Sequence, residues 1–176
     1  MNYKECLTEA MTLLAQDERT IFLGQSVAYP GSALFLTLEG VPCHKKIELP
    51  VAEEMQMGMS IGLSLMGYIP ISIYPRFDFL LLATSQLANH LDKCAEMTHE
   101  EFKPKVIIRT CVGSTSPLYP GVQHCGDYTE AYKLLLKSVK VIKLSEPKEI
   151  VPTYLTALND GESYLIIEVA DLYECR

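Results

Sequence analysis

Short apolar runs alternate along this chain with longer segments of helical periodicity, and this alternation limits the fold more than any other feature. Five runs rich in β-branched or aromatic residues are typical of interior strands; they are Thr20–Leu23, Ile69–Ile73, Val106–Ile108, Val139–Ile142 and Tyr164–Ile167. Helices are predicted between them from Asn2 to Ala15, after Pro50, and over Leu80–Glu96, Tyr128–Lys137 and Lys148–Asn159. The alternation predicts an α/β fold, a mostly parallel sheet with helices on both faces and ligands at the carboxyl ends of the strands.

The length and charge of the chain restrict what it can bind. Its 176 residues, 48% of them hydrophobic, are enough for one core and too few for two ordinary domains, so we expect a single domain over residues 1–176. The net charge of −7 argues against a nucleic-acid groove or an anionic membrane surface, because clustered Lys and Arg bind both.

Cysteine usage indicates a reducing compartment. The six cysteines form no C-x-x-C pair; they are Cys6, Cys43, Cys94, Cys111, Cys125 and Cys175. Because Lys4 and Glu5 interrupt the first turns, no secretory signal is predicted, and we expect a cytoplasmic protein.

No charged side chain occurs from Met55 to Pro75, a length close to that of a membrane-spanning helix. Gly67 and Pro70 interrupt this stretch, and its second part is β-branched. We therefore expect a buried helix followed by a buried strand, and no membrane span.

The most specific motif is Pro50-Val51-Ala52-Glu53, with glycines five and nine residues after the glutamate at Gly58 and Gly62. This pattern resembles the pyrimidine-binding domain of the transketolase superfamily, and most closely the β subunits of 2-oxo-acid dehydrogenases. In those subunits the helix that contacts thiamine diphosphate opens with Pro-Ile-Ala-Glu. The glycine spacing selects Glu53 over Glu54. The similarity extends over most of the chain, through Tyr74–Phe79, Gln86, Asn89, Gln123-His124 and Ser145–Pro147.

The resemblance implies that Glu53 is both a catalytic and a cofactor-binding residue. Thiamine diphosphate reacts through its thiazolium ring after the aminopyrimidine ring tautomerises, and a partly desolvated carboxyl group on a pyrimidine nitrogen drives this step. The alternative is that Glu53 and Glu54 are ordinary first-turn carboxylates favoured by the helix dipole.

Three aromatic residues, Tyr74, Phe77 and Phe79, follow the second predicted strand at its carboxyl end. By resemblance Phe79 stacks on the aminopyrimidine ring, with Phe77 and Tyr74 as alternatives. Core packing explains any one of the three equally well.

The longest predicted loop, Gly113 to Gly126, contains His124, and the resembled β subunits carry a Gln-His in the corresponding place. The resemblance implies that His124 moves a proton or orients a bound carboxylate or carbonyl. The chain departs from the family at Cys125-Gly126, where Ser-Gln is common, so the contacts of those neighbours are not carried over. A solvated loop histidine is the alternative.

Other candidates carry less weight. Arg109, at the end of its strand, is expected to form a surface ion pair. His90 and Cys94 share a helix face but His99 falls beyond it, so no metal site is predicted on this chain.

The resemblance also implies a companion subunit. Superfamily members hold the diphosphate through Mg²⁺ on a second domain with a Gly-Asp-Gly motif and a downstream Asn, and neither Gly126-Asp127 nor Asp160-Gly161 has that context. A partner must then supply the Mg²⁺ site. Small residues at Gly58, Ser60, Gly62 and Ser64 allow close approach of another backbone, and in the resembled family this helix lies at the subunit interface. We expect a hetero-oligomer, a dimer of heterodimers.

The leading hypothesis is the pyrimidine-binding subunit of a split transketolase-like enzyme that acts on a small keto or sugar substrate, by ketol or acyl transfer or by 2-oxo-acid decarboxylation. If Arg176 is the natural end, a free-standing transferase is favoured over a dehydrogenase complex. One alternative is a non-catalytic relative that regulates such an enzyme, which the presence of Glu53 disfavours. The other is a flavodoxin-like nucleotide-binding module.

Overall fold

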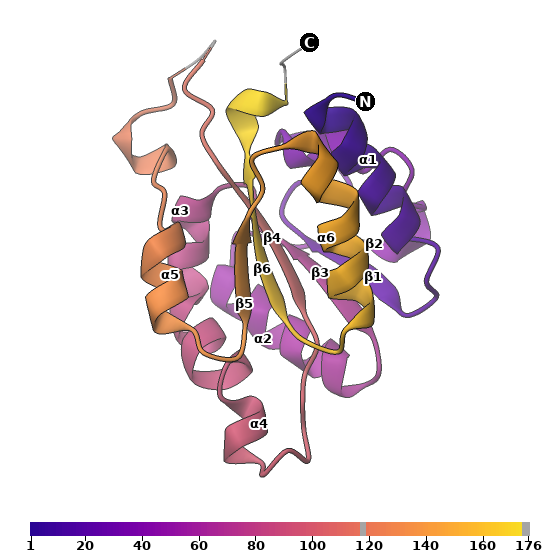
Figure 1. Ribbon diagram of the computed structural model, residues 1–176, viewed down its shortest axis with the longest axis vertical. Coiled ribbons are helices and arrows are strands. Elements are labelled where there is room, and N and C mark those ends of the chain that lie inside the picture. The colour runs from indigo at the N-terminus through magenta and orange to yellow at the C-terminus, as the bar shows by residue number, and fades with distance from the viewer. Residues whose placement is uncertain (117–118, 174–176) are drawn as a thin grey trace.

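A parallel β-sheet forms the centre of the computed structural model, which describes residues 1–116 and 119–173 (Figure 1). The described residues form six strands in the order β2-β1-β3-β4-β6-β5, with every neighbouring pair parallel. They are β1 (Thr20–Gly24), β2 (Lys46–Glu48), β3 (Ile69–Ile73), β4 (Ile107–Val112), β5 (Lys140–Lys143) and β6 (Tyr164–Val169).

Helices connect the strands. The α-helices are α1 (Tyr3–Leu14), α2 (Glu53–Leu65), α3 (Phe77–Leu80), α4 (Cys94–Met97), α5 (Thr129–Leu135) and α6 (Pro147–Asn159). Shorter 3₁₀ turns lie at Leu34–Thr37, Cys43–Lys45, Leu81–Ala83, Val122–His124 and Ala170–Leu172, and a π-helical turn spans Gln86–Leu91. The predicted start after Asn2 is confirmed, because Asn2 and Glu5 form a reciprocal capping box.

The helices cover both faces of the sheet, which confirms the predicted α/β class (Figure 1). On one face α1 and α6 pack over a core that includes Leu7, Phe22 and Ile71. On the other face α2, α3 and α5 enclose a second core around Phe77 and Ile108. Side chains of consecutive strand residues point to opposite faces, so β4 and β6 each contribute to both cores.

The uncharged stretch from Met55 to Pro75 forms α2 and then β3, as predicted. β3 lies between β1 and β4 and is buried at every position. Among the described residues, no helix combines the length and the apolar character that crossing a bilayer requires.

Two elements differ from the sequence prediction. β2 was not predicted, because it is a three-residue edge strand with charged ends and no apolar run. The helix predicted over Leu80–Glu96 begins earlier and is interrupted after its π-helical turn. There the buried Asp92 carboxylate accepts hydrogen bonds from the backbone N–H groups of Ser138 and Val139, at 2.8 and 2.9 Å.

Arg109 does not form the surface ion pair that was expected. Its side chain is fully buried on β4 and pairs with the equally buried Glu168 of β6, with Nε 2.5 Å from Oε1. Thr37 accepts a hydrogen bond from Arg109, while Tyr154 and Tyr173 donate to Glu168. Burial and the nearby Glu168 raise the pKa of both tyrosines well above the usual range, so they remain donors.

Candidate functional site

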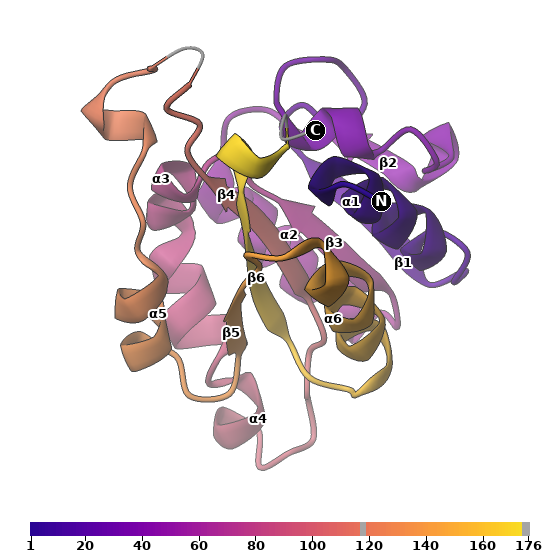
Figure 2. The same cartoon turned by 45° about the horizontal axis from the view of Figure 1, so that its top comes forward.

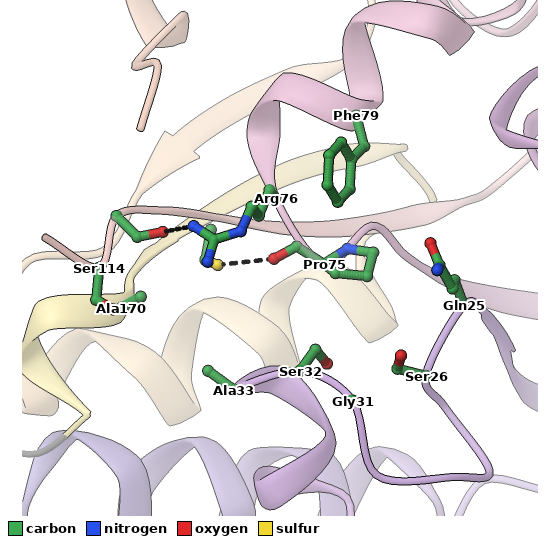
Figure 3. A pocket seen from close by; sticks show the side chains of 12 residues that line it. Gln25, Ser26, Gly31, Ser32, Ala33, Pro75, Arg76, Phe79, Ser114 and Ala170 are labelled. Carbon is green, nitrogen blue, oxygen red and sulfur yellow. Dashed lines mark hydrogen bonds between the residues drawn. The ribbon is translucent and has the colours of Figure 1, made fainter. Parts of the chain in front are cut away.

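A cavity of about 240 Å³ lies where β1, β3, β4 and β6 end. The loops after β1 and β4 and the turn after β6 meet at this end of the molecule (Figure 2). The cavity is lined by residues from all four connections, among them Gln25, Arg76, Phe79, Ser114 and Ala170 (Figure 3). Ligands were predicted at these carboxyl ends, but neither Gln25 nor Arg76 was predicted as a site residue.

Gly24 allows the chain to leave β1 and enter the cavity wall. Its φ is +148°, and a Cβ placed there would lie 2.2 Å from the carbonyl oxygen of Ile73 on β3. Only glycine tolerates this close approach.

The next loop is held by Glu48, at the end of β2. The two carboxylate oxygens accept hydrogen bonds from the backbone N–H groups of Ser26, Val27 and Ala28 at 2.7, 2.8 and 2.7 Å. Burial disfavours the charged carboxylate, but the three hydrogen bonds outweigh it and lower the pKa of Glu48. Glu48 therefore fixes the loop that contributes Gln25 and Ser26 to the cavity. This role of Glu48 was not predicted, because strand β2 has no apolar run in the sequence.

Glu53 begins α2 at the same end of the sheet. Only 7% of the residue is exposed, and within the described residues its carboxylate has no hydrogen-bond or ion-pair partner. Its backbone carbonyl accepts a hydrogen bond from the Tyr74 hydroxyl at 3.4 Å. The residue as a whole is enclosed, but its carboxylate oxygens are not among the fully buried unpaired atoms of the described residues, so a ligand or solvent can reach them.

A buried polar network fixes α2 against β3. Gln56 Nε2 donates to Ser72 Oγ at 3.1 Å and to the carbonyl of Ile73 at 2.9 Å. Ser60 Oγ donates to the carbonyl of Gln56 at 2.8 Å and lies 3.0 Å from Ser72 Oγ. With both hydrogen-bonding side chains buried, the position of the first turn, and hence of Glu53, is determined by the sheet.

Phe79 and His124 are brought into contact by the fold. Their rings meet edge to face with centroids 5.7 Å apart. Phe79 is partly exposed and lines the cavity, whereas His124 Nδ1 is buried with no partner among the described residues. An unpaired buried ring nitrogen is a group that a ligand or a partner can satisfy.

The segment after β3 also holds the loop that contains His124. Arg76 Nη1 donates to the carbonyl oxygens of Gly113 and His124 at 2.7 and 2.8 Å. The Asp78 carboxylate accepts hydrogen bonds from the Gly126 N–H and the Tyr128 hydroxyl. The positions of Phe79 and His124 are thus linked through one short segment.

The other two aromatic candidates belong to the core. Phe77 and Tyr74 are both fully buried, and Phe77 packs against the rings of Tyr128 and Tyr132. Burial raises the pKa of Tyr74 above its usual range. Their enclosure favours the core-packing alternative for both residues and leaves Phe79 as the aromatic ring on the cavity.

The comparisons with known proteins identify relatives for this arrangement. No family model matches the chain. The pyruvate dehydrogenase E1 component subunit beta of Gracilaria tenuistipitata var. liui is 27% identical over 98% of this chain. The chain is similar to 2-oxo-acid dehydrogenase β subunits. A second relative, the 3-methyl-2-oxobutanoate dehydrogenase subunit beta of Mycobacterium tuberculosis, is 29% identical over 76% of this chain.

A solved structure shows the same fold. It is described as a split gene transketolase, inactive beta4 tetramer, and matches 96% of this chain with a TM-score of 0.71 and 16% identity. The predicted resemblance to the transketolase-superfamily pyrimidine-binding domain is therefore confirmed, as is the transketolase-like fold. The chain spans about half the length of the relatives it matches, 54% and 38% of the two β subunits and 51% of the transketolase chain.

Proposed function

We propose that the chain is the pyrimidine-binding subunit of a thiamine-diphosphate-dependent enzyme that becomes active with a companion subunit. The observation that carries the proposal is the Glu53 carboxylate at the start of α2, which belongs to a residue only 7% exposed and has no hydrogen-bond or ion-pair partner among the described residues. Its position matches the Pro-Val-Ala-Glu motif, and the relatives are β subunits of 2-oxo-acid dehydrogenases.

The residues of the site fit the pyrimidine end of this cofactor. Glu53 offers a carboxyl group to a ring nitrogen, and Phe79 offers a partly exposed aromatic face. Thiamine diphosphate, when bound, would supply a nucleophilic carbon for a carbonyl substrate. Glu53 shares a proton with the ring nitrogen, Phe79 orients the ring, and His124 moves a proton at the substrate.

A companion subunit is proposed for the diphosphate and Mg²⁺. Among the described residues, no group of three or more His, Cys, Asp or Glu side chains is arranged to hold a metal ion. The structural neighbour described as an inactive β4 tetramer supports the view that such a subunit is not active alone. The proposed assembly is a dimer of heterodimers, and the substrate is a small keto acid or sugar handled by ketol transfer, acyl transfer or decarboxylation. A cytoplasmic location is proposed too, supported by the free state of the five described cysteines, while Cys175 lies outside the described residues.

The decisive experiment compares Glu53→Gln with the wild type in the complex reconstituted with the companion subunit. The amide can still hydrogen-bond to the ring, so cofactor affinity and assembly size should change little. It cannot share the proton, so hydrogen–deuterium exchange at the thiazolium carbon should slow by about 10²-fold or more, the usual contribution of a general acid–base group.

Glu54→Gln is the matched control. Glu54 is adjacent in sequence but exposed, because neighbouring helix positions point about 100° apart. Exchange should stay near the wild-type rate in this variant. Fast exchange in Glu53→Gln, or a larger loss in Glu54→Gln, would contradict the proposal.

A further inference from the structure

The cavity contains the positive charge of Arg76, which forms no ion pair with any residue that the structure describes. Arg76 lines the cavity, and Figure 3 shows its guanidinium between Pro75 and Ser114, with Phe79 on one side and Ser32 on the other. Among the described residues, no carboxylate forms an ion pair with Arg76.

Nearby carboxylates are engaged with other groups. Asp78 accepts hydrogen bonds from Gly126 and Tyr128. Asp171, next to Gly113, accepts one from the Thr115 N–H at 2.8 Å. Within the described part of the chain, the fold thus brings a cation to the cavity without pairing it with an anion.

The hydrogen bonds of Arg76 leave most of its donors available. Only Nη1 is used, for the carbonyl oxygens of Gly113 and His124, and within the described chain Nε and Nη2 have no acceptor. These two nitrogens lie along one edge of a planar guanidinium, the edge that binds carboxylate and phosphate through paired hydrogen bonds.

The rest of the cavity wall suits the same kind of group. Hydroxyl groups of Ser26, Ser32 and Ser114 and the amide of Gln25 line it, and all can donate hydrogen bonds to an anion. A volume of about 240 Å³ accommodates a small molecule of a few heavy atoms.

We propose that Arg76 determines substrate specificity by binding an anionic group of the substrate, a carboxylate or a phosphate, in this cavity. The anion sits beside Phe79, whose ring contacts His124, so the substrate is held next to the ring proposed to stack on the pyrimidine and near the residue proposed for proton transfer. Calling the anion a substrate rests on the proposed function. The existence of the anion site does not depend on the proposed function, because the site is built from residues of this chain alone.

The test is a titration of the ¹⁵N-labelled full chain, without cofactor or companion subunit, followed by two-dimensional NMR. Pyruvate is the carboxylate probe and glycerol phosphate is the phosphate probe, each compared with sodium chloride at equal ionic strength. Saturable shifts are expected at the Arg76 Nε–H and at the amides of Gly113 and Ser114. The probe that binds more tightly identifies the anionic group.

Three variants separate the charge from the fold. Arg76→Gln should weaken binding about ten-fold or more, as expected for loss of a charge-assisted hydrogen bond. Arg76→Lys keeps the charge and should weaken it less, and Arg19→Gln removes an exposed guanidinium paired with Asp17 and should leave binding unchanged. Equal binding in wild type and Arg76→Gln, or absence of shifts around the cavity, would each overturn the proposal. A different result would reject only the proposed function. In that case the wild-type chain binds the anion as expected, but hydrogen–deuterium exchange at the thiazolium carbon stays fast in the Glu53→Gln complex.

Discussion

The ring of Phe79 meets the ring of His124 edge to face, with centroids 5.7 Å apart, although the two residues lie on different connections of the sheet. The contact leaves Phe79 partly exposed on the cavity wall. His124 is held from the same segment, because Arg76 donates to its carbonyl oxygen. An aromatic surface and a titratable ring are therefore placed together by backbone and side-chain contacts of this chain alone.

Phe79→Ala and Phe77→Ala should have opposite consequences. Phe77 is fully buried, so its truncation should lower the free energy of unfolding by about 3–5 kcal/mol. Phe79 is partly exposed and should cost much less stability, but its loss should weaken cofactor binding in the reconstituted complex. Urea unfolding and a cofactor titration measure the two effects. A stability loss for Phe79→Ala as large as that for Phe77→Ala would place Phe79 in the core.

The exposed face of α2 is predicted to be an assembly surface. Gly58 and Gly62 are exposed, and a Cβ added to either would meet nothing within 4 Å. Gly62→Leu should therefore block assembly with the companion subunit, or self-association, while leaving the chain folded. Gly62→Ala is the control, because it raises helix propensity by about 1 kcal/mol with little added bulk. Size-exclusion chromatography should show smaller species for the leucine variant only, and unchanged elution of both would exclude this surface.

The interior strands and helix α2 were predictable because their signals are local. β3 reads as an uninterrupted β-branched run, and α2 begins at the motif that selects Glu53. Of the four small residues that suggested an interface, however, only Gly58 and Gly62 remain open. Ser60 is buried against Ser72, which helical periodicity alone could not reveal without knowing which side faces the sheet.

The cavity was less predictable because its contacts join distant parts of the chain. Arg76 and Glu48 form hydrogen bonds with backbone groups of other loops. Every residue type carries a backbone carbonyl and almost every type a backbone N–H, so the sequence does not show which of them will be the partners. Arg109 was misjudged for a related reason. Its acidic partner Glu168 is 59 positions away, and only the parallel pairing of β4 with β6 makes them neighbours.

Removing one member of the buried Arg109–Glu168 pair should be more damaging than removing both. Arg109→Leu leaves the Glu168 carboxylate buried without its cation and should cost about 3–5 kcal/mol of unfolding free energy. The double variant Arg109→Leu/Glu168→Leu removes both charges and should be more stable than the sum of the two single losses implies. Urea unfolding of the four proteins measures the coupling. If the losses of unfolding free energy in the two single variants add up to the loss in the double variant, the two charges do not stabilise each other.

Glu48 should make the stability of the cavity loop depend on pH. Three hydrogen bonds from the backbone at Ser26–Ala28 lower the pKa of this carboxylate below its ordinary value of 4.5. Its contribution should therefore be complete above about pH 4.5 and disappear as the pH falls through the folded-state pKa. At pH 7, Glu48→Gln should lower the free energy of unfolding by about 1–3 kcal/mol, because hydrogen bonds to a charged acceptor are lost and the amide presents its own N–H groups to the loop. Urea unfolding of wild type and variant from pH 7 to pH 3 should show the difference narrowing below pH 4.5, since protonation removes the same charge from the wild type. A difference that stays constant over this range would mean that Glu48 does not hold the loop through its charge.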